Sequence, residues 1–82
     1  MIFSPYEIRW QLRRSDLEVN RVHGTETIII NDAKNKKCAN FLRTSVNYYV
    51  VSVCDYSNYV ISQYKFSTCN KSVEFLRDFF NK

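Results

Sequence analysis

The apolar and polar positions at the start of the chain predict an amphipathic helix from Pro5 to Arg14. Ser4 is a favoured N-cap residue, and Pro5 suits the first helical position because its missing N–H needs no partner there. Glu7, three residues after Ser4, completes the sequence pattern of a capping box. These local preferences agree on where the helix begins.

Four runs rich in β-branched and aromatic residues follow this helix and predict strands. They form two hairpins, one around Gly24 and one around the turn signal of residues 55–58. Residues 38–46 fit a further strand or a short helix, and we favour the strand. The four runs are residues 17–22, 27–31, 48–54 and 59–66.

Residues 70–82 return to a helical period, with a single apolar stripe along one side. The short turns between strands require mainly antiparallel pairing, and two helices can cover one face of such a sheet while the other face meets solvent. The sequence therefore predicts one domain over residues 1–82, an α+β fold in two layers. Its sheet is a meander of four or five strands, flanked by an N-terminal and a C-terminal helix. The stripe of the last helix consists of Val73, Leu76, Phe79 and Phe80.

The composition is that of a folded globular domain, because hydrophobic residues make up 45% of the 82 residues and charged residues 24%. The longest apolar runs fall far short of the roughly 20 residues that cross a bilayer, and the first residues lack the basic start of a secretory signal. We therefore expect no membrane span and a cytoplasmic protein, in the host cytoplasm if it is viral. Abundant Asn, Lys, Tyr, Ile and Phe indicate an AT-rich genome, such as that of a low-GC bacterium, its phage or a virus.

The sequence carries none of the strong motifs of enzymes or metal sites. A single glycine, Gly24, excludes the glycine-rich phosphate loops, and no serine stands in a G-x-S-x-G elbow. His23 is the only histidine, and no nucleophile or carboxylate is tied to it by spacing. Cys38, Cys54 and Cys69 are odd in number and lack the close pairs of zinc knuckles, so we expect reduced thiols, no metal and no cofactor.

The predicted first helix has two different faces. At about 100° per residue, Ile8 and Leu12 share one face. The opposite face is aromatic and cationic, which suits stacking on bases, holding phosphates or anchoring a protein partner. The alternative is that the two aromatic side chains turn inward and the arginines only solvate the helix. The residues of the outer face that we predict to bind are Tyr6, Arg9, Trp10, Arg13 and, beside them, Arg14.

A second basic patch follows the first hairpin. Lys34, Lys36 and Lys37 are predicted binding residues with Arg43 near them, although a lysine-rich segment such as residues 32–37 is also typical of a solvated turn. The net charge of +4 permits either a nucleic acid or an acidic protein as the partner, and it does not distinguish between them.

The second hairpin is rich in tyrosine and has no plainly polar face. Either both faces are buried, or one face or edge is reserved for a partner or for a homodimer. The two alternating sets of side chains are Tyr49, Val51 and Val53 on one side, and Tyr48, Val50 and Cys54 on the other.

The order of elements and two C-terminal segments resemble the small anti-CRISPR inhibitors of Gram-positive phages and prophages. The segments are residues 58–62, NYVIS, and the amphipathic run 72–80, SVEFLRDFF. The resemblance implies a phage or mobile-element protein that blocks a host defence or nucleic-acid-processing protein by direct contact. This chain is basic and lacks the acidic cluster of DNA-mimicking members, so it implies contact with protein rather than DNA mimicry.

The helix-strands-helix plan also resembles dsRNA-binding-like ribonuclease toxins that have a single catalytic histidine. In this chain His23 precedes Gly24 and does not follow a glycine-rich approach. We therefore expect a non-enzymatic protein-binding inhibitor with a host protein as its partner. The alternative is a basic nucleic-acid-binding module, and a His23-dependent ribonuclease ranks third.

Overall fold

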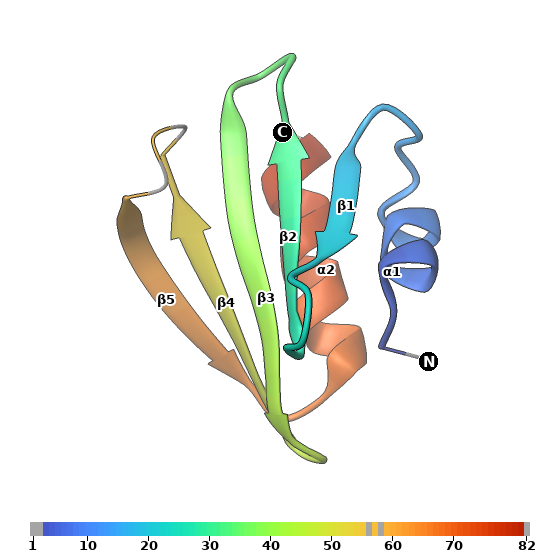
Figure 1. Cartoon of the computed structure of the whole chain (residues 1–82), viewed down its shortest axis with the longest axis vertical. Helices are drawn as coiled ribbons and strands as arrows, with labels where there is room; N and C mark the ends of the chain where they lie inside the picture. The colour runs from blue at the N-terminus through green and yellow to red at the C-terminus, as the bar shows by residue number, and fades with distance from the viewer. Residues whose placement is uncertain (1–2, 56, 58, 82) are drawn as a thin grey trace.

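The computed structural model describes residues 3–55, 57 and 59–81, and this part of the chain forms two helices and five strands (Figure 1). Tyr56 and Asn58 of the expected turn, the first two residues, and Lys82 of the expected last helix lie outside the described residues. The elements are α1 (Pro5–Leu12), β1 (Glu18–Arg21), β2 (Thr27–Asp32), β3 (Lys37–Ser45), β4 (Tyr48–Cys54), β5 (Val60–Phe66) and α2 (Cys69–Asn81).

The five described strands form one antiparallel sheet in the order β1-β2-β3-β4-β5. Each strand pairs with its neighbours in the chain, as short connections between antiparallel strands require. The expected meander and the α+β class are therefore confirmed. Residues 38–45 of the ambiguous segment fall on strand β3, as favoured, and Val46 lies in the turn after it. This strand lies at the centre of the sheet, with Cys38, Ala39 and Phe41 buried.

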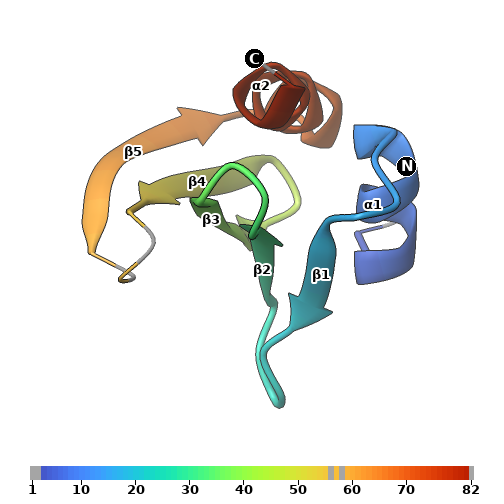
Figure 2. The ribbon, with the colours of Figure 1, turned by 90° about the horizontal axis from the view of Figure 1, so that it is seen from above.

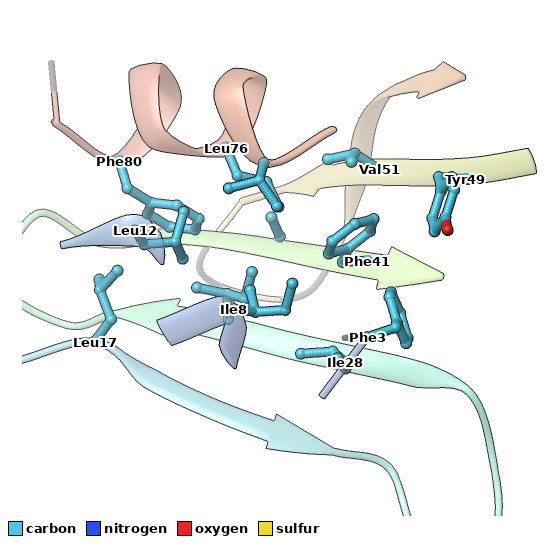
Figure 3. Packing of buried hydrophobic residues seen from close by; sticks show 13 residues of the cluster. Phe3, Ile8, Leu12, Leu17, Ile28, Phe41, Tyr49, Val51, Leu76 and Phe80 are labelled. Atoms are coloured by element: carbon cyan, nitrogen blue, oxygen red, sulfur yellow. The ribbon is translucent and has the colours of Figure 1, made fainter. Parts of the chain in front are cut away.

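Both helices lie on the same side of the sheet (Figure 2). Helix α2 packs against β4 and β5, whereas α1 packs against β1 and α2. Their apolar side chains meet the sheet in one core, where Ile8, Leu12, Leu76 and Phe80 are fully buried (Figure 3). The predicted stripe of the last helix is confirmed, with Phe79 only partly buried at its margin. Neither of the two described helices has the length and apolar character needed to span a membrane.

Helix α1 ends two residues earlier than the sequence predicts. Ser4 caps its start as expected, because its hydroxyl oxygen accepts the Glu7 N–H at 3.2 Å. Arg13 then adopts the left-handed conformation, with a φ of 61°, and its N–H donates to the Trp10 carbonyl oxygen at 3.2 Å. This conformation ends the helix. The sequence has no glycine at that position to indicate the stop.

The face of the sheet away from the helices is not uniformly polar. Cys38 of β3 and Cys54 of β4 stand directly opposite each other there, and both are buried. Ser52 is also buried on this face, where its hydroxyl accepts a hydrogen bond from Gln63 Nε2 at 3.2 Å. Strand β4 is thus largely buried on both faces, which is one of the two predicted alternatives, whereas the edge strand β5 is mostly exposed.

Candidate interaction surface

Helix α1 exposes the face that the sequence predicts to bind. Ile8 and Leu12 dock the helix into the core, where neither retains any exposed area. On the opposite face Tyr6 is 75% and Trp10 is 66% exposed. The alternative in which both aromatic side chains turn inward is therefore wrong. The α1 face consists of Tyr6, Arg9, Trp10 and Arg13, all of them exposed.

An open groove of about 560 Å³ runs along the α1 face. Aromatic rings and guanidinium groups line this groove, and no described carboxylate does. Arg9 and Arg13 form no ion pair with any carboxylate in residues 3–55, 57 and 59–81. The groove therefore suits a ligand that brings negative charge together with flat or apolar groups. The lining residues are Tyr6, Arg9, Trp10, Gln11, Arg13, Arg14 and Ser15.

Arg14 lies beside the α1 face, as predicted, but its guanidinium is engaged within the fold. It donates to the two carboxylate oxygens of Asp32, at 2.7 and 3.1 Å, and to those of Asp16, at 2.6 and 3.1 Å. It also donates to the Phe80 carbonyl oxygen at 2.7 Å, which ties the end of α1 to β2 and to α2. The Arg14 side chain is 16% exposed, so little of it is left for a partner.

The sequence predicts a solvated turn for residues 32–37, but Asp32 is buried. It is the last residue of β2 and is 1% exposed. Besides the bonds from Arg14, its carboxylate accepts the Asn35 N–H at 3.2 Å and the Asn35 side-chain amide at 3.0 Å. The hydrogen bonds from Arg14 lower the pKa of Asp32 to about 2, against the opposing effect of burial. A segment with the composition of a solvated turn therefore begins with a buried carboxylate.

The predicted lysine patch divides into two parts. Lys34 and Lys36 are exposed in the turn between β2 and β3. Lys37 lies against α2, where its Nζ donates to the Phe79 carbonyl oxygen at 2.8 Å and stands 5.4 Å from the centre of the Phe79 ring. Arg43 lies near the other end of β3, because six residues of a strand span about 20 Å. The expected proximity of Arg43 to the lysines is therefore wrong.

The structure brings the α1 face and the β2–β3 turn together. A second, more open hollow of about 700 Å³ adjoins the groove and shares Arg14 and Ser15 with it. Lys34 lines this hollow, and the bond between Arg14 and Asp32 fixes the arrangement because Asp32 immediately precedes the turn. Sequence reasoning found both cationic groups but not the polar residues around them, which no local pattern marks. These residues are Gln11, Ser15, Asp16, Asn35 and Asn81.

Strand β5 carries a second group of exposed apolar side chains. It is an edge strand, since it has a strand neighbour on one side only in the described sheet. Tyr64 is half exposed and its ring centre lies 4.5 Å from that of Phe75 in α2. A homodimer through this hairpin stays a prediction. We define the β5 edge as Tyr59, which immediately precedes the strand, together with Val60, Ile61 and Tyr64 within it.

The cysteines and the histidine line neither the groove nor the hollow. None of Cys38, Cys54 and Cys69 takes part in a disulfide bond within the described structure, and burial raises the pKa of each thiol. Within the described chain, no group of three or more His, Cys, Asp or Glu side chains is arranged to hold a metal ion. His23 is exposed beside Gly24 in the β1–β2 turn. Figure 1 shows this turn at the opposite end of β2 from the β2–β3 turn, which follows Asp32.

Comparison of this chain with protein-family models, with curated proteins and with solved structures finds no match. The resemblances to anti-CRISPR inhibitors and to ribonuclease toxins therefore stay predictions from the sequence. The case for a function rests on the α1 face and the residues around it.

Proposed function

We propose that this protein is a non-enzymatic binding module that acts on a partner protein through the α1 face. One observation carries the proposal: Ile8 and Leu12 dock helix α1 completely, so Tyr6 and Trp10 stay exposed although the fold does not need them there. Large aromatic side chains that stay exposed together on one helix face are typical of interaction sites.

The composition of the α1 face favours a protein partner. Trp, Tyr and Arg are the residues that most often dominate the free energy of binding at protein interfaces. Here Arg9 and Arg13 line the groove along the α1 face together with Trp10. A partner that covers the ring removes apolar area from water and can pair both guanidinium groups with carboxylates.

The support of the α1 face suits inhibition by contact. The bonds from Arg14 to Asp32 and to the Phe80 carbonyl oxygen hold the end of the helix in place. A surface held in this way loses little conformational entropy when it binds. The partner that we propose is a host defence or nucleic-acid-processing protein, blocked by a phage or mobile-element accessory protein.

Affinity capture from a host lysate tests this proposal. We expect the wild-type protein to retain a partner protein after nuclease treatment, and Trp10→Ala to lose that partner while folding normally. Tyr59→Ala is the matched control, because it removes a comparably exposed aromatic side chain from another surface. Capture that survives both Trp10→Ala and Arg13→Glu would exclude the α1 face as the binding surface.

A basic nucleic-acid-binding module is the second candidate. The alternation of Tyr6, Arg9, Trp10 and Arg13 also suits stacking on bases and pairing with phosphates. Binding of this kind weakens steeply with salt, because phosphate contacts release counterions. Capture that disappears after nuclease treatment would favour this candidate over the protein partner.

A further inference from the structure

We propose that the segment bound by this protein is an extended acidic peptide, which runs from Trp10 past Arg13 and Ser15 to Lys34. This inference rests on the proposed function and names the chemistry of the partner. Its basis is the continuity of the groove along α1 with the hollow beside the β2–β3 turn, since the two share Arg14 and Ser15.

The cations along this path outnumber the carboxylates that face them. Arg9, Arg13 and Lys34 are exposed, and none of the three forms an ion pair within the described structure. Among the described residues, Asp16 is the one carboxylate that lines the path, and it is already paired with Arg14 at 2.6 Å. Positive charge therefore remains at both ends of the path for a ligand with carboxylates at both ends.

Asp16 distinguishes a peptide from a nucleic acid strand. Its side chain is 52% exposed and lines the hollow on the way from Arg13 to Lys34. A nucleic acid strand carries a phosphate at every nucleotide and would bring like charge against this carboxylate. A peptide can place neutral residues at this point and donate a backbone N–H to Asp16, while its acidic side chains lie to either side.

The α1 end of the path also selects an apolar or aromatic side chain. Trp10 and Tyr6 expose their rings one helical turn apart in the groove, and an apolar side chain of the peptide gains contact area by packing on them. Arg9 and Arg13 lie beside Trp10, so acidic residues next to that apolar side chain meet a guanidinium group. The expected ligand therefore has an apolar residue among acidic ones, a neutral stretch and a second acidic group.

Selection from a random peptide library displayed on phage tests this inference with the full chain as the immobilised target. We expect the enriched peptides to show the pattern of apolar, acidic, neutral and acidic positions. One enriched peptide, synthesised with a fluorescent label, then gives dissociation constants by fluorescence anisotropy. Oligo(dT) is the nucleic acid probe. Enrichment without acidic residues, no enrichment, or tighter binding of oligo(dT) than of every enriched peptide would overturn the inference.

Charge reversals then locate the peptide on the surface. Arg13→Glu and Lys34→Glu should each raise the Kd of the peptide about fivefold or more, because each replaces an attraction by a repulsion. Lys71→Glu is the matched control, an exposed lysine outside both hollows, and should leave the Kd within about twofold. Circular dichroism checks that each variant is folded.

The effects of these variants on peptide binding distinguish a failure of this inference from a failure of the proposed function. An effect of Arg13→Glu without an effect of Lys34→Glu would overturn the extended path and leave the α1 face as the binding surface. Unchanged binding in Arg13→Glu and in Trp10→Ala would overturn the proposed function together with the path.

Discussion

The α1 face and the β5 edge both expose aromatic side chains, but they offer a partner different chemistry. On α1, the aromatic side chains of Tyr6 and Trp10 alternate with the guanidinium groups of Arg9 and Arg13. On β5, Lys65 is the one charged residue of the strand, and the outer N–H and C=O groups have no strand partner in the described sheet. The first surface therefore offers a partner side chains and positive charge, whereas the second offers backbone hydrogen bonds and apolar area.

The two regions also differ in how the fold supports them. The end of α1 is held by charged hydrogen bonds from Arg14 to Asp32 and Asp16. Strand β5 is held by its pairing with β4 and by ring contacts such as that between Tyr64 and Phe75. Exposed aromatic residues occur on both surfaces, but the residues around them differ. These surrounding residues determine which kind of partner each surface suits.

Removal of the charged hydrogen bonds that hold the end of α1 should have the largest effect on the free energy of unfolding. Asp32→Ala leaves the Arg14 guanidinium without its buried carboxylate, and breaking such a pair lowers the free energy of unfolding by about 3 kcal/mol. Gln63→Ala removes the hydrogen bond from β5 to Ser52 and should cost about 1 kcal/mol or less. Urea unfolding measures both. Equal losses would show that charged hydrogen bonds give α1 no special support.

Affinity for the partner protein should depend on α1 and not on β5. Trp10→Ala should weaken binding about 30-fold, or about 2 kcal/mol, as expected for a central interface residue. Because the ring is exposed, the free energy of unfolding should change by about 0.5 kcal/mol or less. Tyr59→Ala should leave affinity within about twofold. Calorimetric titration and thermal unfolding give the two quantities, and a matching loss of stability would mean that Trp10 supports the fold.

Acid should weaken the support of α1. The pKa of Asp32 is about 2 in the folded protein and near 3.9 in an unfolded chain. Its contribution to stability is therefore complete above about pH 5 and is lost as the pH falls through 2, by about 2 to 3 kcal/mol in total. Asp32→Asn should lack this part of the pH dependence. Urea unfolding between pH 7 and pH 2 compares the two proteins, and parallel curves would contradict the assignment.

Self-association should depend on β5 and not on α1. We expect Ile61→Lys to weaken the homodimer about tenfold, or about 1.4 kcal/mol, because a charge on an edge strand opposes pairing with a second edge. Arg13→Glu, on the α1 face, is the control and should leave the dimer unchanged. Sedimentation equilibrium over a range of concentrations measures both. A dimer that Arg13→Glu disrupts would place the contact on α1.

His23 belongs to neither region, so His23→Ala should have the smallest effect. The side chain is exposed in the β1–β2 turn, and its loss should change the free energy of unfolding by about 0.5 kcal/mol or less. Partner binding and any activity should also persist. A folded variant that loses activity more than about a hundredfold, the scale of a missing general base, would support the ribonuclease interpretation instead.

Local patterns predicted the elements whose causes are local. The cap of Ser4 acts within α1, and the β-branched residues 27–30 favour strand β2 at each position. Strand β3 was ambiguous because Ala39 and Asn40 have no strong preference for strand. Its pairing with β2 on one side and β4 on the other decides the outcome, and residue-by-residue propensity does not contain that information.

Of the candidate site, the sequence predicts only the outer face of α1, because the helical period alone determines which residues share that face. Ile8 and Leu12 fix the inner face of α1, so the outer face follows from the helical period alone. The pair of Arg14 and Asp32 spans 18 positions of the chain, and no local pattern connects the two residues. That pair brings the lysine turn beside the α1 face, so the continuous surface emerges only in the folded protein.

Hydrogen bonds between α1 and α2 have a consequence for the order of folding. Arg77 Nε donates to the Gln11 carbonyl oxygen at 3.0 Å, and Asn81 Nδ2 donates to that of Leu12 at 3.4 Å. These bonds satisfy carbonyl groups that the end of a helix leaves without partners. The strands pair with near neighbours in the chain, which costs less loop entropy than joining α1 to α2. A growing chain can therefore assemble its hairpins early, but it presents a firmly held α1 face only after α2 has been synthesised and docked.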